Sequence, residues 1–320
     1  MKNNINLIDV TLRDGGFTCD FDWPLEFAKE YYNLMCDLDV KFIELGYWQQ
    51  TQKSKNKFYN LDQEMVEKVT GSRGKRNVSI MIDYHYCSKN LDLYPTKLQN
   101  EISLIRLTAR KDLIDDAILF AKKLKDTTGL AISFNIFNIT NYTLLELQNT
   151  VDKILKSDFE FVYMADTHGH LDLNADIKYY ENFFKKIKDL GIKTGFHLHD
   201  HTGKSFLNYT KCLESSYIDF CDTSIMSLGK GAGNLRLESV LKKDEMLRTS
   251  KFVYKYYNDF FKKTINPFYM VTGAYSITDN YANQALERGL SIDDFIEFCS
   301  NIEHVDRDNF NKRLLEEYSR

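Results

Sequence analysis

The chain has 320 residues, of which 43% are hydrophobic and 28% are charged, the balance of an ordinary globular protein. This length is enough for one large domain with a sizeable buried core, and a barrel fold uses it as a single unit. The formal net charge of -4 disfavours a general binder of nucleic-acid backbones, because such proteins are normally basic.

The beginning of the sequence, MKNNINLIDVTLRD, lacks the long apolar stretch of a signal peptide. No window reaches the roughly 18 consecutive apolar residues that a membrane-spanning helix needs. The six cysteines are scattered without a C-x-x-C pair, so we expect reduced, buried thiols rather than disulfides or a structural zinc site. These features predict a cytoplasmic protein that binds neither membranes nor nucleic acid.

Short apolar or β-branched runs alternate with longer amphipathic stretches, a pattern typical of parallel β/α units. The runs with the composition of strands are residues 5–11, 41–46, 78–83, 102–108, 130–137, 159–165, 192–199 and 218–224. The stretches that predict helices between them are 24–38, 60–70, 112–126, 143–156, 172–190, 203–215 and 234–248. The interval 84–101 is the weakest helix prediction, because Pro95 interrupts it. Eight strands in this rhythm favour an α/β fold of the (β/α)8 TIM-barrel type over a doubly wound sheet.

Three of the predicted helices begin at or near a residue that can cap them. Asp112, Thr143 and Asn174 are candidate N-caps, since their side chains can accept bonds from unpaired backbone N–H groups.

After about residue 250 the pattern changes to an aromatic helix, a break at Asn266-Pro267, and further helices near 273–288 and 291–300. We therefore expect a catalytic barrel over residues 1–250. Residues 251–320 are expected to form a helical extension that packs on the barrel or on a partner subunit.

The strongest single motif is His197-Leu198-His199 at the end of the seventh predicted strand. Side chains two residues apart on a strand point to the same face, so that both imidazoles can reach one metal ion. The pair alone does not separate a metal site from two buried histidines that make ordinary hydrogen bonds.

Asp14, which directly follows the first predicted strand, favours the metal site. In a closed eight-stranded barrel, strands one and seven are separated only by strand eight, and their C-terminal ends open onto the same mouth. One carboxylate and two imidazoles leave coordination positions open for substrate, as a catalytic site requires. This ligand set suits Mn²⁺ or Mg²⁺, and Zn²⁺ and Co²⁺ remain possible.

Further polar residues stand at or near the ends of other predicted strands: Glu44, Asp83, Arg106, Asn135 and Asp166. Each of them alone is more often structural than catalytic, but their shared position at the barrel mouth favours a site. We expect Glu44 and Asp166 to orient the metal ligands or Arg13 through hydrogen bonds.

A glycine-rich loop, Leu228-Gly-Lys-Gly-Ala-Gly-Asn-Leu, follows the eighth predicted strand. Glycines at alternate positions let the backbone approach a ligand closely and present its N–H groups. The spacing and position differ from the Rossmann dinucleotide motif. We expect the loop to close over the metal site, with Gly231, Gly233 and Asn234 binding substrate together with Arg13.

Three separated motifs together resemble the DRE-TIM metallolyases: DVTLRDGG at 9–16, FHLHDHTG at 196–203 and SLGKGAGN at 227–234. That family includes 4-hydroxy-2-oxovalerate aldolase, hydroxymethylglutaryl-CoA lyase and isopropylmalate synthase. The resemblance implies that Asp14, His197 and His199 bind a divalent metal and that Arg13 stabilises an enolate-like intermediate. It also matches Asn234 to a loop asparagine near the metal, and Glu44 and Asp166 to acidic positions of the lyase branch.

The details of the first motif are more similar to the aldolase branch. Acyl-CoA-condensing members usually read RDGEQ, whereas this chain reads Arg13-Asp14-Gly15-Gly16-Phe17. Aldolases of this type carry a histidine shortly after RDG as the base, and this chain has none there. The candidates for proton transfer are a tyrosine or one of four histidines: His85, His168, His170 and His201. The glycine loop also lacks the cysteine that acyl-CoA lyases commonly use.

These observations predict a class II, metal-dependent aldolase that forms or cleaves a bond beside the carbonyl of a 2-oxo acid, with an aldehyde as the other partner. One alternative is an acyl-CoA-dependent Claisen-type lyase or synthase, and another is a catalytically inactive barrel that acts as a binding subunit. A homo-oligomer is the default for such an enzyme. The C-terminal helices match in position the region by which some aldolases dock a dehydrogenase, but their sequence does not predict that partner.

Overall fold

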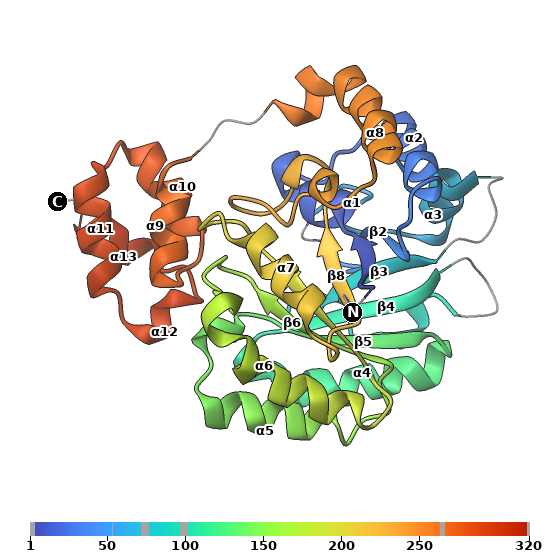
Figure 1. Cartoon of the computed structure of the whole chain (residues 1–320), viewed down its shortest axis with the longest axis horizontal. Helices are drawn as coiled ribbons and strands as arrows, with labels where there is room; N and C mark the ends of the chain where they lie inside the picture. The colour runs from blue at the N-terminus through green and yellow to red at the C-terminus, as the bar shows by residue number, and fades with distance from the viewer. Residues whose placement is uncertain (1–3, 53, 72–76, 97–101, 263–265, 319–320) are drawn as a thin grey trace.

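Eight parallel strands close into a barrel in chain order, as the sequence predicts (Figure 1). The computed structural model describes residues 4–52, 54–71, 77–96, 102–262 and 266–318. The strands are β1 (Asn6–Asp9), β2 (Phe42–Tyr47), β3 (Val78–Asp83), β4 (Ile102–Ala109), β5 (Ala131–Ile136), β6 (Phe161–Asp166), β7 (Lys193–Leu198) and β8 (Phe220–Thr223). Pairing of β1 with β8 closes the barrel, so the ends of β1, β7 and β8 meet at one mouth.

Helices surround the barrel and connect its strands (Figure 1). They are α2 (Leu25–Cys36), α3 (Gln63–Thr70), α4 (Ile114–Thr128), α5 (Leu144–Ile154), α6 (Leu173–Lys188), α7 (Ser205–Glu214) and α8 (Lys243–Lys255). Between β3 and β4, residues 84–96 contain only a 3-10 turn at Leu91–Leu93, and residues 97–101 lie outside the described part.

The helix predicted over 234–248 begins at Lys243 instead. Residues before it form a loop in which Asn234 bridges to His199 and Arg236 bridges to Ser224. The apolar spacing of this segment fits a helix, but pairing with the ends of β7 and β8 stabilises an extended path.

Of the predicted N-caps, Thr143 is confirmed, because its side chain and that of Glu146 form a reciprocal capping box at the start of α5. The other two predictions are wrong. Asp112 lies inside a short 3-10 turn, and α6 is capped by Asp172, which accepts a bond from the Asn174 backbone.

The interior of the barrel is filled in levels. The level farthest from the mouth is apolar, and its aromatic rings lie 5.4 to 6.1 Å apart between centroids: Phe42, Phe161 and Phe220. Two residues further along the same strands, on the same inward face, stand Glu44, Tyr163 and Asp222. Arg106 follows the inward-facing Leu104 in the same way on β4. The polar level therefore lies directly beneath the barrel mouth.

The expected domain boundary between residues 250 and 251 falls inside α8. This helix packs on the barrel through α2, with the rings of Phe252 and Phe27 5.3 Å apart, and the aromatic turn Tyr257–Phe261 continues that contact. A second hydrophobic core begins at Phe268. We therefore place the boundary after Phe261, and call residues 266–318 the C-terminal helical unit.

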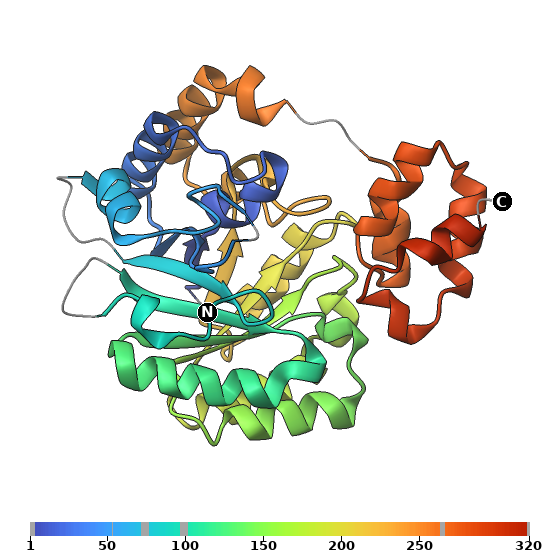
Figure 2. The same cartoon turned by 180° about the vertical axis from the view of Figure 1, so that it is seen from behind.

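The C-terminal helical unit stands beside the barrel as a separate group of helices in both views (Figure 1, Figure 2). It consists of α9 (Phe268–Tyr275), α10 (Asn280–Arg288), α11 (Ile292–Asn301), α12 (His304–Arg307) and α13 (Lys312–Tyr318). It makes polar contacts with the loops that follow β5, β6 and β8, and the ring of Tyr269 lies 5.7 Å from that of His201 in the loop after β7. The polar contacts include Thr140 to Ser276, Asn141 to Asp308, and Lys230 to Asp279, with distances of 2.5 to 2.8 Å.

The sequence also leads us to expect reduced cysteines and no membrane-spanning helix. All six cysteines are free thiols, and five of them are buried. Among the described residues, no helix combines the length and the hydropathy that crossing a bilayer requires.

Candidate metal centre

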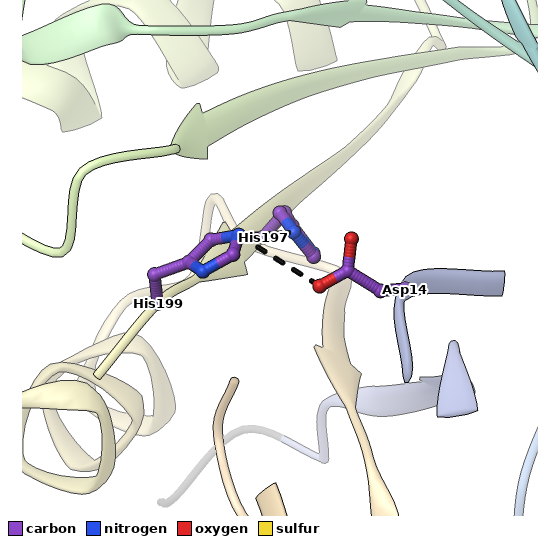
Figure 3. Close-up of side chains that lie close together, drawn as sticks. All are labelled: Asp14, His197 and His199. Atoms are coloured by element: carbon purple, nitrogen blue, oxygen red, sulfur yellow. Dashed lines mark hydrogen bonds and ion pairs between the residues drawn. The ribbon is translucent and has the colours of Figure 1, made fainter. Parts of the chain in front are cut away.

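The three expected metal ligands come together at the barrel mouth (Figure 3). Asp14 ends the short helix α1 (Thr11–Asp14) directly after β1, and the two histidines come from the end of β7. His197 Nε2 lies 3.1 Å from His199 Nε2, which lies 3.9 Å from Asp14 Oδ2. All three side chains are buried, and one candidate ligand atom from each lies within 4.8 Å of the others.

Asp222 fixes the orientation of His197. Its Oδ2 atom accepts a hydrogen bond of 2.9 Å from His197 Nδ1, so the proton of the neutral imidazole sits on Nδ1. The lone pair of Nε2 then points toward His199 and Asp14. A carboxylate behind a ligand histidine is the usual support of a metal site.

The protonation states of the other two ligands also suit a cation. Burial acts to raise the pKa of the Asp14 carboxyl, but the charges of Arg13 and of the neighbouring histidines hold it well below its usual range. Burial and the proximity of His197 lower the pKa of His199 well below its usual value. An ionised carboxylate and a neutral imidazole therefore converge with Nε2 of His197, which is a donor set that fits a divalent cation.

Asp14 is held by neighbours from two segments, α1 and the glycine loop. Arg13 Nη1 lies 2.5 Å from Oδ1, while Oδ2 accepts bonds from Asn234 Nδ2 at 2.8 Å and from the Lys230 backbone at 3.2 Å. A Cβ at Gly229 would lie 2.6 Å from Asp14 Oδ2 and 2.4 Å from Asn234 Nδ2. The glycine at 229 thus allows the loop to close onto the carboxylate.

Arg13 belongs to a buried chain of alternating charges. Its Nε donates to Glu44 at 2.5 Å, Glu44 accepts from Arg106 at 3.3 Å, and Arg106 donates to Asp222 at 2.7 Å. Arg106 has no exposed surface and lies 4.5 Å from the centre of the Tyr163 ring. Gly195 leaves the space for that ring, because a Cβ there would lie 2.3 Å from it. The chain connects Arg13 to the ligand His197 through side chains alone.

Four residues expected at the site do not line the cavity in front of the candidate metal ligands: Asp166, Gly231, Gly233 and Asn234. Asp166 pairs in register with Leu198, so its side chain faces away from the barrel interior that His197 faces. Its Oδ1 accepts backbone bonds from His170 and Leu171 at 2.9 and 3.2 Å, and thereby shapes the loop after β6.

The other three lie in the glycine loop and contact protein instead of the cavity. Asn234 has no exposed surface and donates to Asp14 and to the Leu228 carbonyl. Gly231 passes against the imidazole of His201, and Gly233 accepts a bond of 2.8 Å from the backbone of Asp200. None of the three lines the cavity, and Asn234 supports the candidate ligand Asp14, so substrate binding by these residues stays a prediction.

A cavity of about 750 Å³ opens in front of the candidate metal ligands. Arg13, Asp14, His197 and His199 line it, and so does the side of the C-terminal helical unit that bears Asn280 and Phe310. This volume is typical of a small-molecule site.

Among the histidines considered for proton transfer, His85 lines the cavity. His168 Nε2 lies 3.0 Å from Asp308, and His170 Nδ1 donates to the Gly273 carbonyl. His201 is buried between the glycine loop and Gly273. Tyrosines 47, 59 and 86 also line the cavity.

Sequence reasoning missed Asp222 and the contribution of the C-terminal unit. Asp222 stands two residues after the buried Phe220, so its inward face could have been read from the strand alternation. Residues 278, 280 and 308–310, by contrast, line the cavity only because a distant unit docks on the barrel.

No family model matches the sequence. Similar solved structures include the N-terminal domain of a Bacteroides vulgatus protein described as an aldolase, with a TM-score of 0.75, 21% identity, and coverage of 92% of this chain and 99% of that one. The carboxyl transferase domain of Rhizobium etli pyruvate carboxylase, solved with pyruvate as a Y628A variant, has a TM-score of 0.69 and 15% identity over 93% of this chain and 56% of that one. The HMG-CoA lyase of Brucella melitensis has a TM-score of 0.60 and 16% identity over 80% of this chain and its full length. These likenesses confirm the fold.

Proposed function

We propose that this chain is a divalent-metal-dependent aldolase that forms or cleaves the carbon–carbon bond beside the carbonyl of a 2-oxo acid such as pyruvate. The observation that carries the proposal is the joint placement of Asp14, His197, His199 and Arg13 at one end of a cavity. The similar structures support it, since they include a domain of a protein described as an aldolase, a carboxyl transferase domain solved with pyruvate, and an HMG-CoA lyase.

Asp14, His197 and His199 would hold the metal, with Mn²⁺ or Mg²⁺ favoured by the mixed oxygen and nitrogen ligands. The bound cation would supply Lewis-acid polarisation of the 2-oxo acid. The residues around it supply orientation: Asp222 sets the tautomer of His197, and Asn234 holds Asp14.

Arg13 provides the charge that offsets a developing enolate. Its Nε and Nη1 atoms are taken by Glu44 and Asp14, while Nη2 makes no hydrogen bond within the described residues. Because Arg13 lines the cavity, this free donor is available to a substrate oxygen. A fixed cationic donor in a buried site stabilises an oxyanion without reorganisation at the moment of reaction.

Proton transfer falls to a side chain that lines the cavity, and we assign it to His85. In the cleavage direction the base takes the proton of the 4-hydroxyl, the electron pair of the C3–C4 bond passes to C3, and the aldehyde leaves. C3 is then protonated to give the methyl group of the 2-oxo acid. His85→Gln should lower turnover by about 10²-fold or more, and His304→Gln, on an exposed histidine of α12, should leave it unchanged.

The Claisen-type alternative is less well supported by the site. Within the described residues the nearest cysteine in sequence to the glycine loop, Cys221, is fully buried, and burial raises the pKa of its thiol well above the usual value. Release of a free thiol from acetyl-CoA in the presence of a 2-oxo acid would identify that reaction. The inactive-barrel alternative conflicts with the intact ligand trio.

The experiment that tests the proposal follows deuterium exchange at the methyl group of pyruvate by NMR. We expect exchange with Mn²⁺ or Mg²⁺ present, and its loss after chelation or in His199→Asn. The matched variant His304→Asn should exchange at the wild-type rate. Failure of the metal-replete wild-type protein to exchange the methyl protons would refute the proposed function.

A further inference from the structure

We infer, resting on the proposed function, that the acceptor is a neutral polyhydroxylated aldehyde, recognised by the part of the cavity formed by the β5 and β6 loops and the C-terminal helical unit. Carbon–carbon bond formation would join C3 of the 2-oxo acid to the aldehyde carbon. The methyl group loses one proton, and the aldehyde oxygen gains one to become the new 4-hydroxyl, so the step needs no oxidant or reductant.

The cavity lining away from the metal ligands is rich in uncharged hydrogen-bonding groups. They come from segments far apart in sequence: Asn135, Asn138, Thr167, Asn280 and Asn309. An amide both donates and accepts, and so does an aliphatic hydroxyl. A row of such groups therefore complements a chain of hydroxyls better than it complements an alkyl chain.

Asn138 is the residue that points most clearly to a ligand. It is only 4% exposed, it lines the cavity, and its Oδ1 atom is buried without a partner. Its Nδ2 atom also makes no hydrogen bond within the described residues. The backbone at Asn138 is left-handed, with φ of 56°, and its N–H is held by the Thr167 hydroxyl at 3.0 Å. A buried polar group without a partner destabilises the protein, and a ligand hydroxyl bonded to it would remove that cost.

Asn135 presents a second unused donor in the same cavity lining as Asn138. Its Oδ1 atom accepts a bond of 2.7 Å from Ser133, whereas its Nδ2 makes no hydrogen bond within the described part of the chain. Asn135 and Asn138 are three residues apart at the end of β5, and both line the same cavity. Two amides of one cavity with unused hydrogen-bonding positions can each bind a hydroxyl of the same ligand.

Arg110 and Lys111 of the same lining are each paired with a carboxylate, which disfavours an anionic acceptor. Arg110 makes two bonds of 3.1 Å to Asp112, and Lys111 lies 2.6 Å from Glu146. Asp308 accepts from Asn141 at 2.5 Å and adds a negative charge to the lining. A phosphorylated acceptor would gain no free cation here and would meet that carboxylate.

The cavity is also larger than the smallest aldol substrates require. A volume of about 750 Å³ belongs to sites for drug-sized ligands, well above what a three-carbon oxo acid and a two-carbon aldehyde occupy. The C-terminal helical unit contributes Asn280, Asn309 and Phe310 to this extra space. The ring of Phe310 provides an apolar surface for the carbon-bound hydrogens of such a chain.

The test compares acceptors of equal length with pyruvate and metal-loaded full-length protein. We expect kcat/KM for erythrose to exceed that for butanal by at least about tenfold, because a site built to bind hydroxyls rejects an analogue that lacks them. Asn138→Gly, which keeps the left-handed backbone, and Asn280→Ala should each lower the ratio of kcat/KM for erythrose to kcat/KM for butanal. Asn301→Ala, on an exposed asparagine of the same unit outside the cavity, is the matched control.

Two outcomes would overturn the inference while pyruvate deuterium exchange remains intact: butanal performing as well as erythrose, or erythrose 4-phosphate exceeding erythrose about tenfold. Loss of the exchange itself would instead refute the proposed function. A binding measurement that needs no catalysis separates the two cases. Saturation-transfer NMR with erythritol should show contact with the wild-type protein and a weaker signal with Asn138→Gly, and equal signals would contradict the inference.

Discussion

The orientation of the Arg13 side chain is fixed by ion pairs with its neighbours. Two of its nitrogen atoms are fixed by carboxylates of Glu44 and Asp14, and both of these acids are buried. The guanidinium cannot rotate away from the cavity without breaking both ion pairs. Its position therefore depends on Glu44, and the hydrogen bond between the two agrees with the expectation from the sequence that Glu44 orients Arg13.

Replacement of Arg13 by lysine tests this arrangement at the residue scale. Lysine keeps the positive charge but loses the fork that contacts Glu44, Asp14 and the cavity together. We expect Arg13→Lys to lower kcat by about 10²–10³-fold, the usual effect of removing one oxyanion donor. Metal content, measured by mass spectrometry, should stay at the wild-type level. Undiminished turnover would show that Arg13 does not act on the enolate.

Asp222 orients the candidate metal ligand His197 through a hydrogen bond. Asp222→Asn removes the carboxylate that accepts the His197 Nδ1 proton, and the amide that replaces it can offer a donor instead. We expect the affinity for Mn²⁺ to fall by about 10–100-fold in competition with a fluorescent chelator. Asp219→Asn is the control, because Asp219 is a partly buried acid near the start of the same strand that pairs with Lys188. Equal affinities for the two variants would reject the role of Asp222.

At the scale of elements, the site depends on the loop after β8 closing onto α1. The loop meets Asp14 with one backbone N–H and one side-chain amide, and it pairs with the end of β7 through the bridge of His199 to Asn234. A segment that supports two ligands at once tolerates little displacement.

Gly229→Ala should displace this loop. The added Cβ would lie 2.4 Å from Asn234 Nδ2 and 2.6 Å from Asp14 Oδ2, so one of these side chains must move. We expect weaker metal binding and lower turnover with a cooperative unfolding transition retained. Gly191→Ala is the control: its φ of 77° strains alanine, yet its Cβ would meet no other atom. Gly191→Ala should lose stability but bind metal with the affinity of the wild type. If Gly229→Ala also bound metal with the wild-type affinity, the predicted clash would be contradicted.

Asp166, which shapes the loop after β6, should make the stability of the protein depend on pH. Burial raises the pKa of Asp166 from 3.8 to about 7, although backbone bonds from Leu171 and His170 act to lower it. The native protein therefore keeps a proton that the unfolded chain releases as the pH rises. The contribution of this group to the free energy of unfolding is complete below pH of about 4 and is lost by pH of about 7.

Asp166→Asn cannot ionise, while its amide oxygen can still accept the two backbone bonds. The stability of this variant relative to the wild type should therefore increase between pH of about 4 and 7 and remain level above that range. The total change is on the order of a few kcal/mol, at about 1.4 kcal/mol for each unit of pKa difference. Urea unfolding at several pH values measures it. A relative stability that does not change with pH would show that Asp166 is ionised in the native protein.

At the scale of the whole molecule, the barrel was predictable because parallel strands buried on both faces appear as continuous apolar runs. The ligand trio was predictable for a related reason, since barrel closure places the ends of β1 and β7 at one mouth. The prediction failed where long-range pairing decides the structure. Residues 234–242 have helical spacing but pair with strand ends, and Asp166 lies at a strand end yet faces outward.

The C-terminal helical unit was predictable as helices but not as part of the site. Its docking depends on single polar contacts such as Lys230 to Asp279, which join residues 49 positions apart in the sequence. The sequence shows no pattern that pairs these two residues. The consequence for function is large, because this unit forms part of the cavity wall.

The central claim is that Asp14, His197 and His199 bind one divalent metal ion that the reaction requires. Metal titration of chelator-treated protein, with pyruvate methyl exchange followed at each addition, tests it most directly. We predict about one equivalent bound per chain, activity that rises in step with occupancy, and loss of both in Asp14→Ala. Less than about a tenth of an equivalent bound, with no activity gained on adding metal, would contradict the claim.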